Sequence, residues 1–273
     1  MRRFLMNSKA GLPLLVLLLA GVAAAKGPKQ KAWQMLQAGA TAKSTGERAT
    51  AVRVLGLIQN DRQAVELAEK ALQDEQAPVR AAAATALGQM GSKGSIPKLK
   101  EALKDQAVEV VMAATHSLRA LGDATAYEVY YAVLTGERKS GAGLVEHQKQ
   151  MLKDPKKMAQ FGFEQGLGFV PFASVGYGVV KAVRRDDTSP VRAGAAKVLA
   201  SDPDPRSGQA LVEAATDKSW IVRAAALDAL ARRGDASLLE AIVAKMSDEN
   251  DAVRYTAAAA VVRLATLPKS AGR

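Results

Sequence analysis

The stretch PVRAAAATALGQMG, residues 78–91, recurs in near copies along this 273-residue chain. The copies are PVRAGAAKVLA at 190–200, IVRAAALDALARRG at 221–234 and AVRYTAAAAVVRLA at 252–265. Val191, Val222 and Val253 are each 31 residues apart, and the same interval separates Val79 from Val110 in the related stretch VEVVMAATHSLRALG. A fixed period of this length indicates a repeat architecture.

Each repeat contains two predicted helices. Apolar residues at helical spacing form one stripe in the first part of a unit, and a glycine-containing turn usually follows it. A second amphipathic stretch closes the unit, such as IPKLKEALKD at 96–105 or LLEAIVAKMSD at 238–248. Two helices per 31 residues predict an all-α fold of the α-solenoid (superhelix) type.

An aspartate stands six residues before the arginine of most units, and we interpret these residues as a structural ladder. We expect the ladder to link neighbouring units, the carboxylate accepting from helix N-terminal amides and from the next arginine. The third unit has Val111 in place of the arginine, so the ladder is expected to stop there. The ladder residues are Asp74, Arg80, Asp186, Arg192, Asp217, Arg223, Asp248 and Arg254.

This D…VR.AAA.AL..LG pattern resembles the HEAT-repeat class, and specifically the short HEAT-like repeats found in phycobilisome lyases. With ERATAVRVLGLI at 47–58 counted as a diverged first copy, the chain has about six units, over roughly 44–135 and 186–267. The resemblance implies a curved stack of helix pairs that binds other molecules, and by itself it implies no activity. Whether the two sets of repeats stack continuously across the interval between them is left open.

The first 25 residues have the three parts of a secretory signal peptide. Basic residues are followed by an uncharged run at 10–25 that ends in three alanines. Sixteen helical residues span about 24 Å, which is short of the roughly 30 Å hydrocarbon core of a bilayer. We therefore expect cleavage near Ala25 and export, to the periplasm or to the outside of the cell. Cleavage removes three positive charges from the net charge of +11 and leaves +8.

The expected organisation has five parts. They are a signal peptide at 1–25, an N-terminal capping helix at 26–43, repeats 1–3 at 44–135, a basic insertion rich in glycine and phenylalanine at 136–185, and repeats 4–6 with a polar tail at 186–273.

No constellation of residues in the sequence indicates an enzyme. The chain has no cysteine, which excludes thiol chemistry, disulfides and cysteine-ligated metals. The two histidines, His116 and His147, are followed by Ser117 and Gln148, so the His-Glu pairs of deoxyhypusine hydroxylase, a HEAT-like enzyme, are missing. No phosphate loop and no G-x-S-x-G elbow is present. We expect no enzyme activity, cofactor or metal, and keep a bilin-lyase-like or hydroxylase-like enzyme as the weakest alternative.

The insertion holds all the phenylalanines that follow the signal peptide. Residues 158–180, MAQFGFEQGLGFVPFASVGYGVV, carry a single charge, on Glu164. Alternating glycines suggest a β-hairpin. Small residues one helical turn apart on either side of Pro171 suggest a helical hairpin instead, and we favour the helical hairpin because helices are predicted on both sides.

Three interpretations of the insertion remain open. It packs its phenylalanines on the repeat ends or the concave groove, it contacts an anionic membrane surface through its lysine and arginine flanks, or it docks a protein or hydrophobic ligand. The candidate contact residues are Phe161, Phe163, Phe169, Phe172, Tyr177, Lys153, Lys156, Lys157, Lys181, Arg184 and Arg185.

The function expected from the sequence is that of an exported, non-enzymatic HEAT-repeat scaffold that binds a protein partner. The alternative is a peripheral membrane protein anchored by residues 158–180. Nucleic acid is not expected as a partner, because the basic residues do not follow a groove-like repeat.

Overall fold

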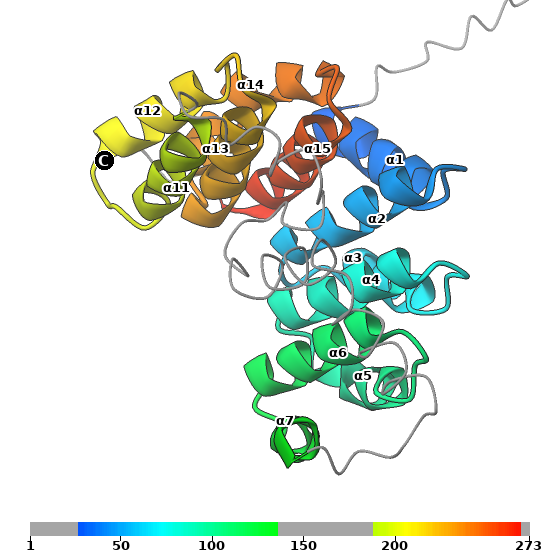
Figure 1. The fold of residues 1–273 in the computed structure, drawn as a ribbon. Helices are drawn as coiled ribbons and strands as arrows, with labels where there is room; N and C mark the ends of the chain where they lie inside the picture. Colours follow the sequence, from blue (N-terminus) through cyan, green and yellow to red (C-terminus); the bar gives the residue numbers. More distant parts are fainter. Residues whose placement is uncertain (1–26, 136–187, 269–273) are drawn as a thin grey trace, which may run out of the picture.

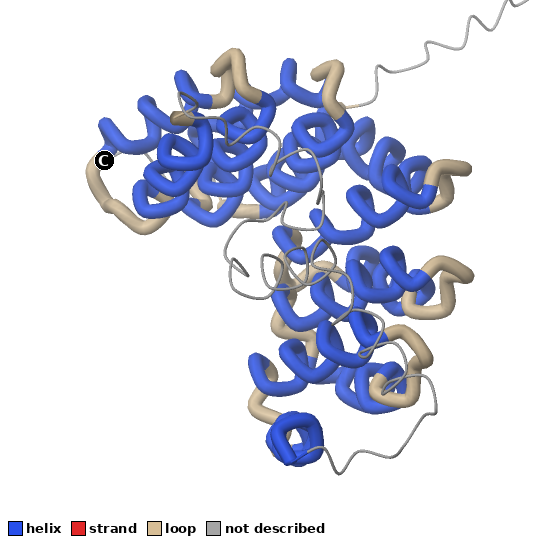
Figure 2. Tube along the Cα trace, in the orientation of Figure 1, coloured by secondary structure: helices blue, strands red, loops and turns tan. Residues whose placement is uncertain are grey.

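The computed structural model of the protein describes residues 27–135 and 188–268, and all regular structure in these two ranges is helical (Figure 2). Most helices form consecutive pairs, which confirms the predicted all-α solenoid. The first helices of the units are α2 (Thr45–Val54), α4 (Ala77–Gln89), α6 (Val108–Ala120), α11 (Ser189–Leu199), α13 (Trp220–Arg233) and α15 (Asp251–Thr266). The second helices are α3 (Arg62–Ala71), α5 (Ile96–Ala102), α7 (Thr125–Thr135), α12 (Pro205–Ala214) and α14 (Leu239–Val243), and α1 (Pro28–Ala40) precedes them all.

Local sequence signals set where the helices begin and end. The side chains of Ser44, Asp61 and Asn250 each accept hydrogen bonds from amides in the first turn of the following helix, and so satisfy donors that have no partner within the helix. The first helices α4, α6 and α13 are followed by Gly91, Gly122 and Gly234, which have φ values of 70°, 81° and 72°. Glycine adopts this left-handed conformation without steric cost, so the chain can turn sharply into the second helix.

The core is one continuous cluster that runs through both sets of repeats. It is formed mainly by the apolar stripes of the first helices, in which Val79, Val222 and Val253 are fully or almost fully buried. Many of the other buried positions are alanine, which lets adjacent first helices approach closely. The repeats are therefore held together by stacking of first helix on first helix.

The order of the helices in space differs from their order in the sequence. The N-terminal helix α1 packs against α15, which is the last helix in the described sequence, and also against α2 (Figure 1). The C-terminal units therefore come first in the stack, which runs from α11 through α13 and α15 to α1, and then through α2 and α4 to α6 and α7. The two ends of this bent stack are α11 and the α6–α7 pair. Residues 136–187 are the covalent link between these two outer ends.

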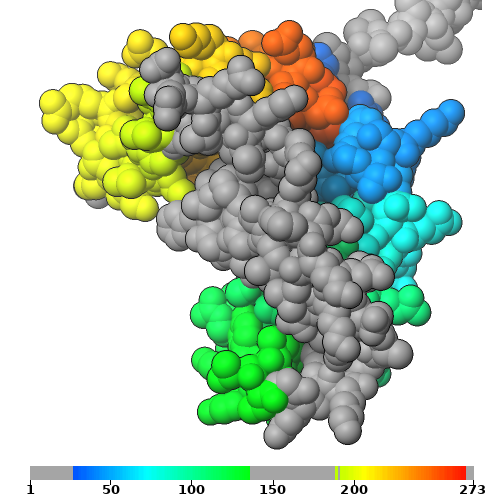
Figure 3. Space-filling view, viewed as in Figure 1, coloured from blue at the N-terminus to red at the C-terminus, as the bar shows by residue number. Residues whose placement is uncertain are grey.

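The place where the first and last described helices meet, formed by α15, α1 and α2, is called the seam below. Within the described residues α15 has no second helix after it, and α1 packs on it instead, with Ala32, Trp33 and Leu36 buried. The helix expected at 26–43 therefore lies inside the stack, between α15 and α2. In the space-filling view the orange surface of the C-terminal units adjoins the blue surface of the N-terminal helices (Figure 3).

Side chains specific to the seam replace the usual contacts between repeats. The hydroxyl of Tyr255 donates a 2.6 Å hydrogen bond to Oε1 of Glu47. The Tyr255 ring lies directly over Gly39, where a Cβ atom would be 2.4 Å from the ring and 2.7 Å from the Cβ of Ala51. Glu47 occupies the position that corresponds to the buried Val79 of the next unit. The seam therefore depends on contacts of Tyr255, Glu47 and Gly39 that differ from the ordinary contact between repeats.

Candidate functional site

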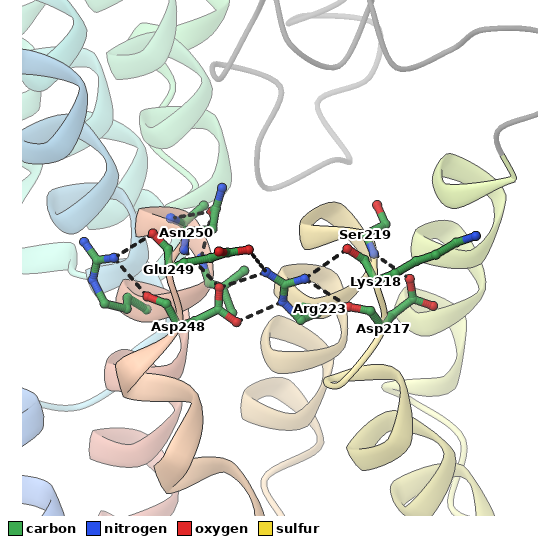
Figure 4. A network of polar contacts seen from close by, with 10 residues as sticks. Asp217, Lys218, Ser219, Arg223, Asp248, Glu249 and Asn250 are labelled. Carbon is green, nitrogen blue, oxygen red and sulfur yellow. Dashed lines mark hydrogen bonds and ion pairs between the residues drawn. The ribbon is translucent and has the colours of Figure 1, made fainter.

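The aspartate–arginine ladder is built from ion pairs between neighbouring units. Nε and Nη2 of Arg223 donate to the two carboxylate oxygens of Asp248, each over 2.9 Å (Figure 4). Nη1 of the same arginine donates to the backbone oxygens of Asp217 and Lys218 in its own unit, at 3.0 and 3.2 Å. Each arginine therefore ties the loop of its own unit to the aspartate of the following unit.

The same geometry recurs along the stack. Arg48 pairs with Asp74 over 2.9 and 3.0 Å, and Arg80 pairs with Asp105 over 2.7 and 2.8 Å. Arg192 contacts Asp217. In every pair the arginine belongs to the preceding unit, so the expected pairing of each carboxylate with the next arginine is wrong. Asp186, the remaining predicted ladder residue, lies outside the described residues.

Three ladder carboxylates, those of Asp74, Asp105 and Asp248, have lowered pKa values. In Asp248 burial raises the pKa, but hydrogen bonds from Arg223 and from the Asn250 amide outweigh burial and lower the pKa below its usual 3.8. Asp105 has a lowered pKa for the same balance of reasons, with Arg80 as the donor. In Asp74 the largest influence is the hydrogen bond from Arg48, which lowers the pKa. These three carboxylates have a structural role, because they accept hydrogen bonds from groups within the stack.

The ladder is interrupted at the seam. Arg254 would need a carboxylate at position 42 of the next unit in the stack, and that residue is alanine. Nη1 of Arg254 donates instead to the backbone oxygens of Asp248 and Glu249, and Nη2 contacts Asp251 in its own helix. The hydrogen bond from Tyr255 to Glu47 is the polar contact that crosses the seam at this point.

The α11 end of the stack leaves a repeat-core stripe uncovered. Val191, Gly194, Ala195 and Val198 lie at positions i, i+3, i+4 and i+7, on one face of α11, and all four are exposed; the two valines are each 74% exposed. The corresponding residues of α4, α13 and α15 are all buried, at 79, 82, 83 and 86, at 222, 225, 226 and 229, and at 253, 256, 257 and 260. The stripe is bare because no described unit precedes α11. These four residues are called the α11 stripe.

The opposite end of the stack is also apolar. Leu134 of α7 is 83% exposed, whereas its equivalents Leu103 and Leu72 are only 8% and 6% exposed. Tyr127 and Tyr131 lie on the same face, at i and i+4 relative to Leu134 at i+7, and they are 59% and 69% exposed. Tyr127, Tyr131 and Leu134 are called the α7 face. Both ends therefore expose residues, Leu134 and the α11 stripe, at positions that are buried in other units of the stack.

An open depression of about 430 Å³ lies beside the turn after α13. It is lined by residues 200–203, 233–236 and Pro268. Its arginine, Arg233, directs its guanidinium into the neighbouring loop and donates to the backbone oxygens of Asp202 and Asp204. These donors of Arg233 are therefore already used within the fold.

The described residues contain little that indicates catalysis. His116 forms a 2.9 Å hydrogen bond between Nδ1 and the hydroxyl of Tyr130, at an exposed position. Within residues 27–135 and 188–268 no group of three or more potential metal-binding side chains is found. None of the helices in these ranges is long and apolar enough to cross a membrane.

The candidate contact residues of the insertion, from Lys153 to Arg185, lie outside the described residues, as does the predicted hairpin at 158–180. The α7 face and the α11 stripe were not singled out in the sequence. The available signal was the repeat register itself: Leu134 and Val198 occupy core positions in the last unit before the insertion and the first unit after it.

Taken together, stacked helix pairs and an arginine–aspartate ladder define a helical-repeat solenoid. The sequence model of HEAT repeats matches residues 34–128 and 178–263, so the chain belongs to the HEAT-repeat family. No match is found among curated proteins.

Solved structures of other helical-repeat proteins are distantly similar. The CpcE–CpcF complex of phycocyanin lyase from Nostoc sp. is 22% identical, covers 94% of this chain and 100% of its own, and has a TM-score of 0.34. Human deoxyhypusine hydroxylase is 20% identical, covers 88% and 86% of the two chains, and has a TM-score of 0.32. A designed armadillo repeat protein is 18% identical, covers 85% and 98%, and has a TM-score of 0.26. No activity of this chain follows from likenesses at this level.

Proposed function

We propose that the protein is an exported, non-enzymatic scaffold that binds a protein partner through the α7 face. The observation that carries this proposal is the exposure of Tyr127, Tyr131 and Leu134 at one end of the helical stack. HEAT repeats generally serve protein–protein interaction, which agrees with such a role.

The chemistry of the α7 face suits a protein partner. Tyrosines supply a large apolar ring and a polar hydroxyl, and they are enriched in the central residues of protein interfaces. Their spacing with Leu134 lines them up along one side of α7, so that a helix or an extended segment of a partner can lie across all three. Exposed apolar side chains grouped in this way usually mark a binding site.

The experiment is photo-crosslinking from the face itself. A photoreactive amino acid at position 131, introduced into the full chain in cells of its source, should capture a protein, whereas the same amino acid at the exposed position 63 of α3 should not. Tyr127→Ser combined with Leu134→Ser should abolish the capture. Equal capture from positions 63 and 131, or capture that persists in the double variant, contradicts the proposal.

Export and the absence of enzyme activity have separate tests. If the signal peptide is cleaved as proposed, the exported chain begins at or near Lys26, which N-terminal sequencing detects. Iron or a bound chromophore in the purified protein would favour the enzyme alternative. Attachment to membranes through residues 158–180, the alternative function, predicts that the chain sediments with anionic vesicles.

A further inference from the structure

The α11 stripe is shaped to receive a helix of a preceding repeat. Its valines flank Gly194 and Ala195, and a Cβ atom at Gly194 would have no other heavy atom within 4 Å. In α4, α13 and α15 the same four positions are covered by the preceding unit. Terminal repeats of solenoids normally carry a polar outer face, so a bare core stripe at an end indicates that something covers it.

The chain itself supplies repeat-like sequence directly before α11. The HEAT-repeat match begins at residue 178, although α11 begins only at Ser189. At the other end of the stack the match stops at residue 128, inside α7. The repeat pattern therefore continues in front of α11, whereas it ends before the exposed Tyr131 and Leu134.

The length and composition of the linking segment fit this role. Residues 136–187 number 52, more than one 31-residue unit, and residues 158–180 among them carry one charge. The segment is joined to α11 without a linker, which gives it a high effective concentration at the stripe.

A second copy of the chain fits the stripe poorly. In an ordinary contact between units, Gly88 of α4 lies so close to α6 that an added Cβ would be 2.4 Å from Oγ of Ser117. The residue of α6 that corresponds to Gly88 is Arg119, and the residue of α11 that corresponds to Ser117 is Val198. A second copy that stacked its α6 on α11 would place Arg119 against Val198. It would also lack the ladder arginine, because Val111 occupies that position.

We propose that the α11 stripe is the docking site of the chain's own residues 158–187. Docking buries Val191 and Val198 and completes the stack at this end, while the α7 face stays free. This inference uses a different end of the molecule from the proposed function and does not depend on it.

The test uses the natural absence of cysteine from the chain. A single cysteine in the variant Val198→Cys is alkylated with iodoacetamide in the intact chain and in a chain whose residues 158–180 are replaced by a glycine-serine linker of equal length. We expect alkylation to be at least about tenfold slower in the intact chain, because burial of a thiol suppresses its reaction. Gln63→Cys, exposed on α3, should react fast in both chains, and Val222→Cys, the buried equivalent of Val191, should react slowly in both.

Three results overturn the proposal. The first is alkylation of Val198→Cys in the intact chain as fast as that of Gln63→Cys; if the chain then also sediments with anionic vesicles, residues 158–180 contact a membrane instead. The second is equal protection in the intact and linker chains. The third is protection that disappears on dilution, which indicates a second copy. If the linker chain does not fold, the triple variant Phe161→Ser, Phe169→Ser and Phe172→Ser in the full chain takes its place and should expose Val198→Cys in the same way.

Discussion

Tyr255 donates its hydroxyl to Glu47 across 208 residues of sequence, and this 2.6 Å hydrogen bond joins the last repeat of the chain to the first. With this contact the described helices form a stack that is continuous from α15 through α1 to α2. The tyrosine is almost fully buried, at 4% exposure, and burial together with Glu47 raises the pKa of its hydroxyl. The raised pKa keeps the hydroxyl protonated, and so able to donate to Glu47, at neutral pH.

The Tyr255→Phe variant should lower the free energy of unfolding by about 1–2 kcal/mol, since it leaves a partly buried carboxylate without its donor. Urea unfolding followed by circular dichroism measures the loss. The matched control is Tyr130→Phe, which removes an exposed hydrogen bond to His116 and should change stability much less. Equal losses of unfolding free energy in the two variants would mean that the seam hydrogen bond contributes no more to stability than an exposed one.

Gly39→Val should lower the stability of the fold more than Gly94→Ala, a substitution at an uncrowded glycine. A Cβ at position 39 would lie 2.4 Å from the Tyr255 ring and 2.7 Å from Ala51, so α1 must move away from α15. Overpacking of this kind costs about 1–3 kcal/mol. The control is Gly94→Ala, where an added Cβ meets no atom within 4 Å and where little change in melting temperature is expected. A Gly39→Val protein as stable as the parent would show that this close approach is not required.

Arg223→Met should destabilise the stack strongly. The variant leaves Asp248 without its bidentate partner at a site where both side chains are 11% exposed, which is expected to cost roughly 2–4 kcal/mol. The exposed pair of Arg62 and Glu66 is the control, and Arg62→Met should have little effect. Similar melting temperatures for the two variants would argue against a stabilising role of the ladder.

The ladder also predicts how stability depends on pH. The pKa values of Asp74, Asp105 and Asp248 are lower in the folded chain than the usual 3.8. A lowered carboxylate pKa contributes stability that is fully present above the unfolded pKa and is lost as the pH falls through the folded value. We expect these groups to add no pH dependence between about pH 5 and 7, and to destabilise the protein progressively below about pH 4.

The matched variant for this prediction is Asp248→Asn. Urea unfolding at pH 7, 5, 4 and 3 should show lower stability than the parent at pH 7 and a shallower loss between pH 4 and 3. A parallel pair of curves over the whole range would mean that Asp248 does not contribute to the acid sensitivity.

The helices and their buried faces could be predicted from the sequence, because the 31-residue period marks the same apolar positions in each unit. The arginine–aspartate spacing also predicted links between units, but the expected direction was wrong: the partner of Asp248 is Arg223 of the preceding unit and not the next arginine. Which unit supplies the arginine of each ion pair depends on how consecutive loops lie side by side, and the spacing of residues along the sequence does not show this.

The order of the repeats in space could not be predicted, because it depends on contacts of the last described helix, α15, with α1 and α2. Two signals were present and were not decisive on their own. The stretch at 252–265 is rich in alanine and valine and has only two charged residues, Arg254 and Arg263, unlike a terminal repeat with a polar outer face. The first unit has Glu47 where the others have valine, and in the structure this carboxylate accepts a hydrogen bond from Tyr255.

The central claim, that the two sets of repeats join through α15, α1 and α2, is tested most directly by cutting the chain within its covalent link. A specific protease site is introduced between residues 140 and 143, the folded protein is cleaved, and the product is passed over a size-exclusion column without denaturant. We predict that both fragments elute together at the position of the intact protein. After the same cleavage in the seam variant Gly39→Leu with Tyr255→Lys, the fragments should separate. Separation of the fragments in the parent protein, or their continued association in the seam variant, would contradict the claim.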